Sequence, residues 1–263
     1  MRSSDWVCFA YFGFLVVACW LPPLATRARL TIIGVAAGVA AAMVRYSAAL
    51  PGVIHDWAPL LYISIGYYLT GLLFVAPSSR LETWLLDGDR RLFGDPTIRF
   101  ARWPPALTAY LDIVYMGCFL LLPGGLVVLL AGGHAHEANR YWTVVAIADL
   151  GAFAPLAVFQ TRPPWQIEPA ATVSAAGTQR LAGLMVRHAT TGANTFPSGH
   201  VSVSLAIALV VFGSMPLAGL VLLALSLSIA VACVVGRYHY AIDVVAGAAW
   251  GLLAWILVIL SGV

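Results

Sequence analysis

Two short polar segments interrupt an otherwise apolar chain, and each contains a histidine beside residues that could assist it. In GRYHYAIDVVAG (236–247), His239 and Asp243 are four residues apart, so on a helix they share one face and can hydrogen-bond. A carboxylate on one ring nitrogen fixes the tautomer and makes the other nitrogen a better nucleophile or base. Arg237 precedes His239 by two residues, close enough to hold an oxyanion there. A cation, a nucleophilic base and an orienting acid in so short a segment suggest phosphoryl chemistry.

The second segment, NTFPSGHVSV (194–203), reads as the beginning of a helix. Pro197 suits a helix start and Ser198 is a good cap, so we expect the amides of Ser198, Gly199 and His200 to be free donors at a helix N-terminus. Such amides bind anions, and Gly199 has no side chain to keep a phosphate away from the backbone. His200 is then placed to donate a proton to an oxygen that leaves the phosphate.

A long polar stretch precedes this segment and begins near a third candidate residue, Arg162. It runs from Gln160 to His200, is rich in Gly, Thr and Pro, and contains no run long enough to span a membrane. Loops of this length in compact proteins are usually functional or disordered. Because Arg162 and His200 lie at its two ends, we interpret the loop as functional.

The remaining sequence provides the elements that must position these residues. Of 263 residues, 61% are hydrophobic and 10% charged, whereas soluble domains have about a quarter charged residues, so the chain is predicted to be a multi-pass membrane protein. The net charge of +3 is too small to indicate a nucleic-acid partner. Eight apolar runs predict membrane helices, at roughly 6–24, 30–49, 58–76, 106–131, 140–160, 198–213, 216–236 and 241–262.

Two regions follow from this pattern: N-terminal transmembrane helices over 1–50 and a catalytic membrane domain over 51–263. A charged stretch between Pro77 and Pro105 separates two of the apolar runs. Ser78 or Ser79 can cap a short helix there, with Glu82 in its first turn. This stretch is either an amphipathic helix lying in the membrane interface or a loop that covers the bundle.

Other polar and sulfur-containing residues have simpler interpretations. His55 is predicted to be structural, and His134 and His136 to be solvated, because two ligands in a short loop do not make a metal site. Asp149, a carboxyl within an apolar run, either lines a substrate cavity or pairs with a Tyr or Arg. We expect no metal and no cofactor. The four cysteines are predicted to be small buried hydrophobes: Cys8, Cys19, Cys118 and Cys233.

The motifs together resemble the type 2 phosphatidic acid phosphatase (PAP2) superfamily. The second motif of that family, Pro-Ser-Gly-His, is intact at 197–200, and the third is matched by Arg237, His239 and Asp243 with a short Arg–His spacing. The first motif, a Lys followed by six residues and Arg-Pro, is half kept. Arg162 is followed by proline, but Pro155 occupies the Lys position and the chain contains no Lys. The resemblance covers about the last 190 residues and leaves two N-terminal helices outside.

The resemblance implies an all-α, polytopic transmembrane bundle with a six-helix core, about two additional N-terminal helices and the interfacial amphipathic helix. It also implies a metal-independent reaction on a lipid phosphate, in which His239 attacks phosphorus and His200 protonates the leaving alcohol. Arginine and backbone donors, here Arg162, Arg237, Ser198 and Gly199, would bind the phosphate. Arg187 or His188 could replace the missing Lys.

The acceptor of the phosphoryl group is left open by the sequence. DRRLFGDP, YLDIVYMGCFLLLP and FQTRPPW look like the inositol-phosphotransferase branch, typified by inositol phosphorylceramide synthases. PSGH and the retained Arg162-Pro163 are typical of the hydrolases, so a phosphatase is favoured and a headgroup transferase is the alternative. A lipid transporter or scaffold that has lost catalysis is a third possibility, although both histidines and Asp243 are retained. The sequence does not indicate an oligomeric state.

The orientation in the membrane is predicted with two opposing arguments. Segments near 25–29, 77–105, 161–197 and 237–240 should lie at one face, which holds most of the arginines. The positive-inside rule would place that face in the cytoplasm. The resemblance implies an extracytoplasmic site, and some of these arginines would serve anionic substrate. We therefore predict a protein of the bacterial cytoplasmic membrane with an extracytoplasmic active site.

Overall fold

The chain folds into packed apolar helices, in a computed structural model that describes residues 1–94, 103–167 and 191–263. The described residues form no strand, which confirms the all-α membrane bundle. Every predicted apolar run corresponds to a helix or to consecutive helical segments. The main helices are α1 (Ser3–Ala18), α2 (Thr26–Tyr46), α3 (Gly52–Gly71), α4 (Ser79–Phe93), α6 (Pro105–Gly117), α7 (Leu121–Ala131), α8 (Ala138–Phe153), α9 (Pro164–Ile167), α11 (Gly199–Ser214), α12 (Pro216–Val235) and α13 (Ala241–Ser261).

Four helical segments in the described residues are long and apolar enough to cross a membrane. They are Thr26–Ala49, Pro105–Ala131, Pro216–Val235 and Ala241–Ser261, and the helices α1 and α11 are shorter but also apolar. In the segment 105–131, the short 3₁₀ turn Cys118–Leu120 joins α6 to α7. Their outward faces carry large apolar side chains, as expected of helices whose solvent is lipid.

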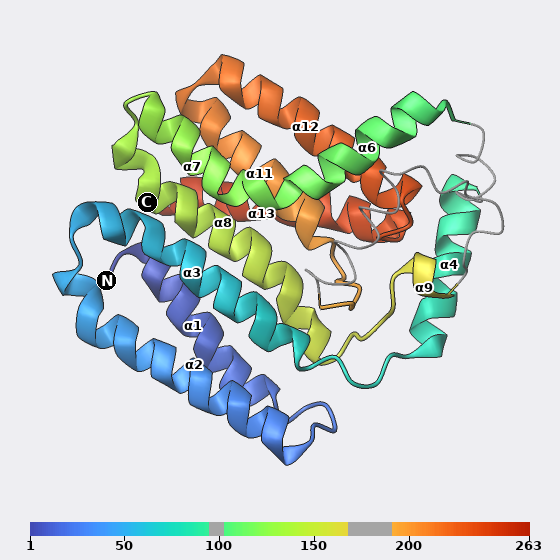
Figure 1. The fold of residues 1–263 in the computed structure, drawn as a ribbon, viewed down its shortest axis with the longest axis horizontal. Coiled ribbons are helices and arrows are strands. Elements are labelled where there is room, and N and C mark those ends of the chain that lie inside the picture. Colours follow the sequence, from blue (N-terminus) through green and yellow to red (C-terminus); the bar gives the residue numbers. More distant parts are fainter. Residues whose placement is uncertain (95–102, 168–190) are drawn as a thin grey trace.

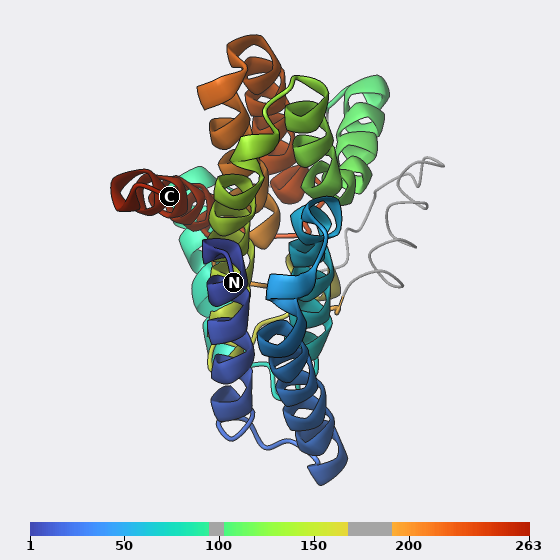
Figure 2. The ribbon, with the colours of Figure 1, turned by 90° about the vertical axis from the view of Figure 1, so that its left-hand side faces the viewer.

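The centre of the bundle is formed by α8 and α11. Most residues of both helices are buried, including Trp142 and Tyr141 of α8, which are among the largest fully enclosed side chains. Helices α1 and α3 pack on one side of α8, α2 packs on α1, and α12 packs on α11 (Figure 1). Turned by 90°, the bundle shows α1 and α2 at one edge and α12 at the opposite edge (Figure 2).

Two glycines allow α13 to approach α11 closely. A Cβ atom on Gly247 would lie 2.6 Å from the carbonyl oxygen of Ser198, and one on Gly251 would lie 2.4 Å from that of Ser202. This spacing, a glycine every four residues along one helix face, is the small-residue interface that lets membrane helices touch backbone to backbone. The contact places the first turn of α13 directly beside the first turn of α11.

The charged stretch after Pro77 contains the helix α4, as one of the two alternatives predicted, and this helix crosses the end of the bundle (Figure 1). Ser78 is its N-cap, and its hydroxyl accepts a hydrogen bond from the Leu81 amide at 3.4 Å, as predicted. The face of α4 turned to the bundle buries Glu82, Leu85 and Asp89. Two of these three are acids, so this helix does more than cover apolar surface.

Candidate active site

Three chain segments that are far apart in sequence meet at the end of the bundle. The strand-like pair Thr161 and Asn194 is joined by a backbone hydrogen bond of 2.9 Å and by a side-chain bond of 3.0 Å between the Asn194 amide and the Thr161 hydroxyl. The Ser198 amide donates to the Asp243 carbonyl at 3.0 Å. The polar loop, the start of α11 and the start of α13 are therefore fixed to one another.

The two histidines face each other within this junction. Nε2 of His239 lies 3.4 Å from Nδ1 of His200, and Nδ1 of His239 lies 3.4 Å from a carboxylate oxygen of Asp243. The predicted His–Asp contact is confirmed, but the expectation that both residues share a helix face is wrong. His239 precedes α13, whose N-cap is Tyr240, and Asp243 is the third residue of the helix. Its carboxylate turns back to accept the Tyr240 amide at 3.2 Å, and this capping contact brings it to His239.

Burial makes His239 a neutral base. Its residue is 5% exposed, and removal from water lowers the pKa of its imidazole well below the ordinary value, because the charged ring is poorly solvated there. With Nδ1 directed to Asp243, the lone pair available for attack is on Nε2. That atom faces His200, so the nucleophile and the proton donor would act on one reacting group.

Aromatic rings enclose His200. The Tyr115 ring stacks on it with centroids 5.2 Å apart, and the Phe119 ring meets it edge-on at 5.4 Å. Tyr115 in turn stacks on Tyr238 at 3.9 Å, in the turn that holds His239. This stack fixes the plane of the His200 ring. These aromatic residues were not predicted as part of the site.

The backbone at the start of α11 differs from the prediction. The Ser198 amide is bound to Asp243, and the Gly199 amide donates to the Thr195 hydroxyl at 3.3 Å, so neither is a free donor as expected. Ser198 is the N-cap by position, but its hydroxyl makes no capping bond. The side-chain hydrogen bond at this helix end is made instead by the Thr195 hydroxyl. Gly199 also has a packing role, since a Cβ there would lie 2.8 Å from the Phe153 ring.

Arg162 is held by an acid that was predicted only as a first-turn residue of a surface helix. The Glu82 carboxylate accepts the Arg162 backbone amide at 2.9 Å, Nε at 2.9 Å and Nη2 at 2.8 Å. These hydrogen bonds lower the pKa of Glu82, which is 2% exposed, and raise that of Arg162. One edge of the guanidinium is thus occupied, while its other edge still presents N–H groups suited to a phosphate.

A second acid of α4 holds the start of α13. The carboxylate oxygens of Asp89 accept the backbone amides of Ala241 at 2.7 Å and Ile242 at 3.0 Å. Burial raises the pKa of Asp89, and the two amide bonds oppose that shift. Asp89 thereby serves as the anion at the N-terminus of α13, two residues from the predicted nucleophile.

Arg237 lies in the turn between α12 and α13. Its backbone has a left-handed φ of 58°, a conformation that costs energy for a residue with a side chain. Its guanidinium approaches the Pro164 carbonyl at 3.5 Å, so it lies beside the segment that follows Arg162. The other two residues suggested for phosphate binding, Arg187 and His188, lie outside the described residues.

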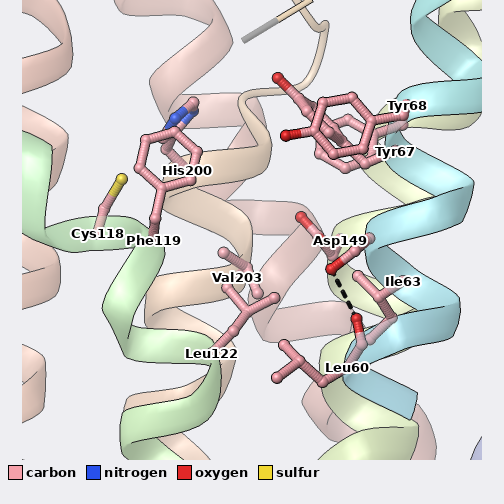
Figure 3. Close-up of a pocket in the computed structure, with 12 residues that line it drawn as sticks. Leu60, Ile63, Tyr67, Tyr68, Cys118, Phe119, Leu122, Asp149, His200 and Val203 are labelled. Atoms are coloured by element: carbon pink, nitrogen blue, oxygen red, sulfur yellow. Dashed lines mark hydrogen bonds between the residues drawn. The ribbon is translucent and has the colours of Figure 1, made fainter. Parts of the chain in front are cut away.

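Two cavities meet at His200. A small one, of about 30 Å³, lies among the three segments and is lined by His200, His239, Tyr238 and Thr195 with neighbouring residues. A larger one, of about 240 Å³, extends from His200 between α3, α7, α8 and α11 (Figure 3). Asp149 lines it, which agrees with one of the two alternatives predicted for this carboxyl.

The residues interpreted as structural agree with the prediction. His55 is buried and its Nε2 lies 2.8 Å from the Asp5 carboxylate, on α1. The four cysteines are buried and free. His136 is exposed beside Glu137, at 3.5 Å.

Comparison with known proteins gives a single family. The model for the PAP2 superfamily matches residues 83–257, which is more than half of the chain. The matched region includes most of α4 and all of the residues of the histidine site. No curated protein and no solved structure matches the chain at a significant level.

Proposed function

Because the chain belongs to the PAP2 superfamily, a phosphatase-type family of membrane enzymes, we propose that it hydrolyses a phosphomonoester or diphosphate of a lipid. The observation that supports this most directly is the alignment of Asp243, His239 and His200 in one chain of contacts. This arrangement provides a positioned nucleophile and a second ring for proton transfer, which is what a covalent phosphoryl transfer requires.

The proposed reaction has two steps. First, the bound phosphate anion favours the protonated form of His200, Nε2 of His239 attacks phosphorus, the bond from phosphorus to the lipid oxygen breaks, and the His200 imidazolium gives its proton to that oxygen. Second, water attacks the phosphohistidine, His200 accepts the proton of that water, and phosphate leaves His239. Asp243 stabilises the positive charge that the His239 ring gains in the first step. Arg162 and Arg237 would offset the charge of the transferred group.

The rings must separate for the first step. An attacking atom and its target lie about 3–3.5 Å apart in a reactive complex. A phosphoryl group between His239 and the oxygen protonated by His200 therefore needs more room than the 3.4 Å between the ring nitrogens. We expect binding of phosphate to move the His239 turn and the aromatic stack on Tyr115 apart.

The two histidines can be separated by choice of leaving group. His239→Ala should abolish turnover of every substrate, because no phosphoenzyme can form. His200→Ala should lose about 10²–10⁴ in rate on a lipid phosphate, whose alkoxide needs a proton. On nitrophenyl phosphate, whose leaving group needs little help, the same variant should recover much of that loss. Equal losses on both substrates would mean that His200 binds phosphate and does not protonate the leaving oxygen.

Hydrolysis and its alternatives differ in what they release. We expect the protein to release inorganic phosphate from a lipid phosphate in detergent even with EDTA present. His239 would be the nucleophile, so the attack would need no metal-activated water. A headgroup transferase would release little phosphate and would move a labelled headgroup to a lipid alcohol. A transporter or scaffold would do neither.

We further propose that the active site faces the extracytoplasmic side. Ser79, at the start of α4, is exposed at the active-site end, and His136 is exposed at the other end of the bundle. In a variant without native cysteines, Ser79→Cys should react with an impermeant thiol reagent in intact cells. His136→Cys should react only after permeabilisation, and the reversed pattern would place the site in the cytoplasm.

A further inference from the structure

The larger cavity has the form of a chain-binding site that begins at the proposed proton donor. His200 and Phe119 line one wall, the Tyr67 and Tyr68 side chains lie opposite, and Leu60 and Leu122 lie at the far end (Figure 3). The active-site end of α3 is its C-terminus, so Leu60 lies deeper than Tyr68. Eight residues of helix separate them, which corresponds to roughly 12 Å at 1.5 Å per residue. The depth suits a lipid chain attached to the oxygen that His200 protonates.

One group in this cavity is unlike its surroundings. Asp149 is 6% exposed, and its side chain lies between the tyrosines and the apolar end (Figure 3). Within the described part of the chain, its carboxyl makes no hydrogen bond and no ion pair. A carboxyl enclosed by Ile63, Phe153 and Val203 is costly unless a partner occupies the cavity with it.

On the basis of the proposed function, we propose that Asp149 binds a hydroxyl group on the chain of the lipid substrate. A hydroxyl both donates and accepts, so it satisfies a carboxyl in either protonation state. A metal ion is a poorer occupant, because the described residues contain no group of three His, Cys, Asp or Glu able to hold one. The preferred substrate is then a phosphate ester of a lipid alcohol that carries a second hydroxyl.

Much of this cavity is built outside the part of the chain that matches the family. Leu60, Ile63, Ser64, Tyr67 and Tyr68 all come from α3, and the match to the PAP2 superfamily begins at residue 83. Asp149 and His200 lie within the matched region. The site for the lipid chain is therefore composite: its reacting end lies in the region that matches the family, and the opposite wall is provided by α3, which precedes that region.

The test uses a series of long-chain alkyl phosphates that differ only in one hydroxyl, moved one carbon at a time away from the phosphate. The unsubstituted alkyl phosphate is the reference. Wild type should prefer one hydroxylated position, with kcat/KM raised roughly two- to a hundredfold, the range for one hydrogen bond to a carboxyl in either protonation state. Asp149→Leu should lose this preference and keep its rate on nitrophenyl phosphate. Asp149→Asn, which can still donate and accept, should retain part of it.

Asp112→Asn is the matched control, because Asp112 is also a buried carboxyl in an apolar helix but does not line this cavity. It should leave the preference unchanged. The proposal is overturned if wild type shows no preference at any position, or if Asp149→Leu and Asp149→Asn show the wild-type preference. Either result would mean that water alone solvates Asp149.

A binding measurement keeps this test independent of catalysis. The corresponding alkanediols and alkanol, which carry no phosphate, should raise the melting temperature of wild type in detergent, the best diol more than the alkanol. That difference should vanish in Asp149→Leu. If no substrate is turned over but the diol effect is present, hydrolysis fails and the hydroxyl site stands. If turnover is present and neither assay distinguishes the hydroxyl, the hydroxyl site fails and hydrolysis stands.

Discussion

Replacing Glu82 by glutamine should weaken catalysis by releasing Arg162. The carboxylate accepts three hydrogen bonds from Arg162, two of them from the guanidinium edge at 2.9 and 2.8 Å. Glutamine has the same shape but only one oxygen, so its amide NH₂ would face a guanidinium N–H. At least one bond of the fork is therefore lost, and the charge that holds the cation in place is lost with it.

The size of the effect follows from the environment of the pair. A hydrogen bond to a charged group contributes about 1.5–3 kcal/mol. The Arg162 side chain is 41% exposed, so water replaces part of the lost interaction. We therefore expect about 1–2 kcal/mol, which corresponds to a five- to thirtyfold fall in kcat/KM. If Arg162 binds phosphate more strongly in the transition state than in the ground state, kcat should fall with it.

The assay is release of phosphate from a lipid phosphate and from nitrophenyl phosphate, with the melting temperature measured on the same samples. Asp87→Asn is the control, since Asp87 lies on the same helix and makes no hydrogen bond or ion pair with the described residues of the site. It should retain wild-type kinetics. The reasoning fails if Glu82→Gln keeps the wild-type kcat/KM, or if it lowers only the melting temperature, because Glu82 would then stabilise α4 without positioning Arg162.

Three further changes test the site and its frame. Arg162→Lys should reduce kcat/KM at least as much as Glu82→Gln, because an ammonium group lacks the two edges with which a guanidinium can bind an acid and a phosphate at once. Activity within threefold of wild type would remove Arg162 from the site. Gly251→Ala should lower the melting temperature, because the added methyl group pushes α13 away from Ser202 and reduces the free energy of unfolding by about 1–3 kcal/mol. Gly38→Ala is the control and should not lower it, since a Cβ atom there meets nothing within 4 Å. In an NMR titration the buried His239 ring should remain neutral at pH 6, because burial lowers its pKa. An ordinary imidazole of pKa about 6.5 is mostly protonated at that pH, so a titration midpoint near 6.5 would contradict the burial of His239.

The helices could be predicted because lipid selects apolar side chains along each whole span. The contact between His239 and Asp243 could also be predicted, since four residues in sequence keep them close whether or not both are helical. What could not be predicted is the partner of a buried acid. Glu82 reads as a favourable first-turn residue of a surface helix, and its pairing with Arg162 depends on a contact across eighty residues.

The same limit explains the error at the start of α11. A Pro-Ser-Gly-His sequence before an apolar run correctly predicts where a helix begins. Whether its first amides are free depends on what else reaches them, and here the Asp243 carbonyl and the Thr195 hydroxyl do. Local sequence specifies the donors at a helix end, whereas tertiary packing specifies their acceptors.

The two buried acids of α4 connect parts of the site that the motifs present as separate. Glu82 and Asp89 are seven residues apart, so they lie on one face of the helix, roughly 10 Å from each other. One binds Arg162, and the other binds the first amides of α13, whose capping residue Asp243 orients His239. A shift of α4 would therefore move Arg162, the proposed phosphate-binding cation, and His239, the proposed nucleophile, together. Because α4 lies across the end of the bundle and not within it, we infer that the two acids hold it there and thereby support both halves of the site.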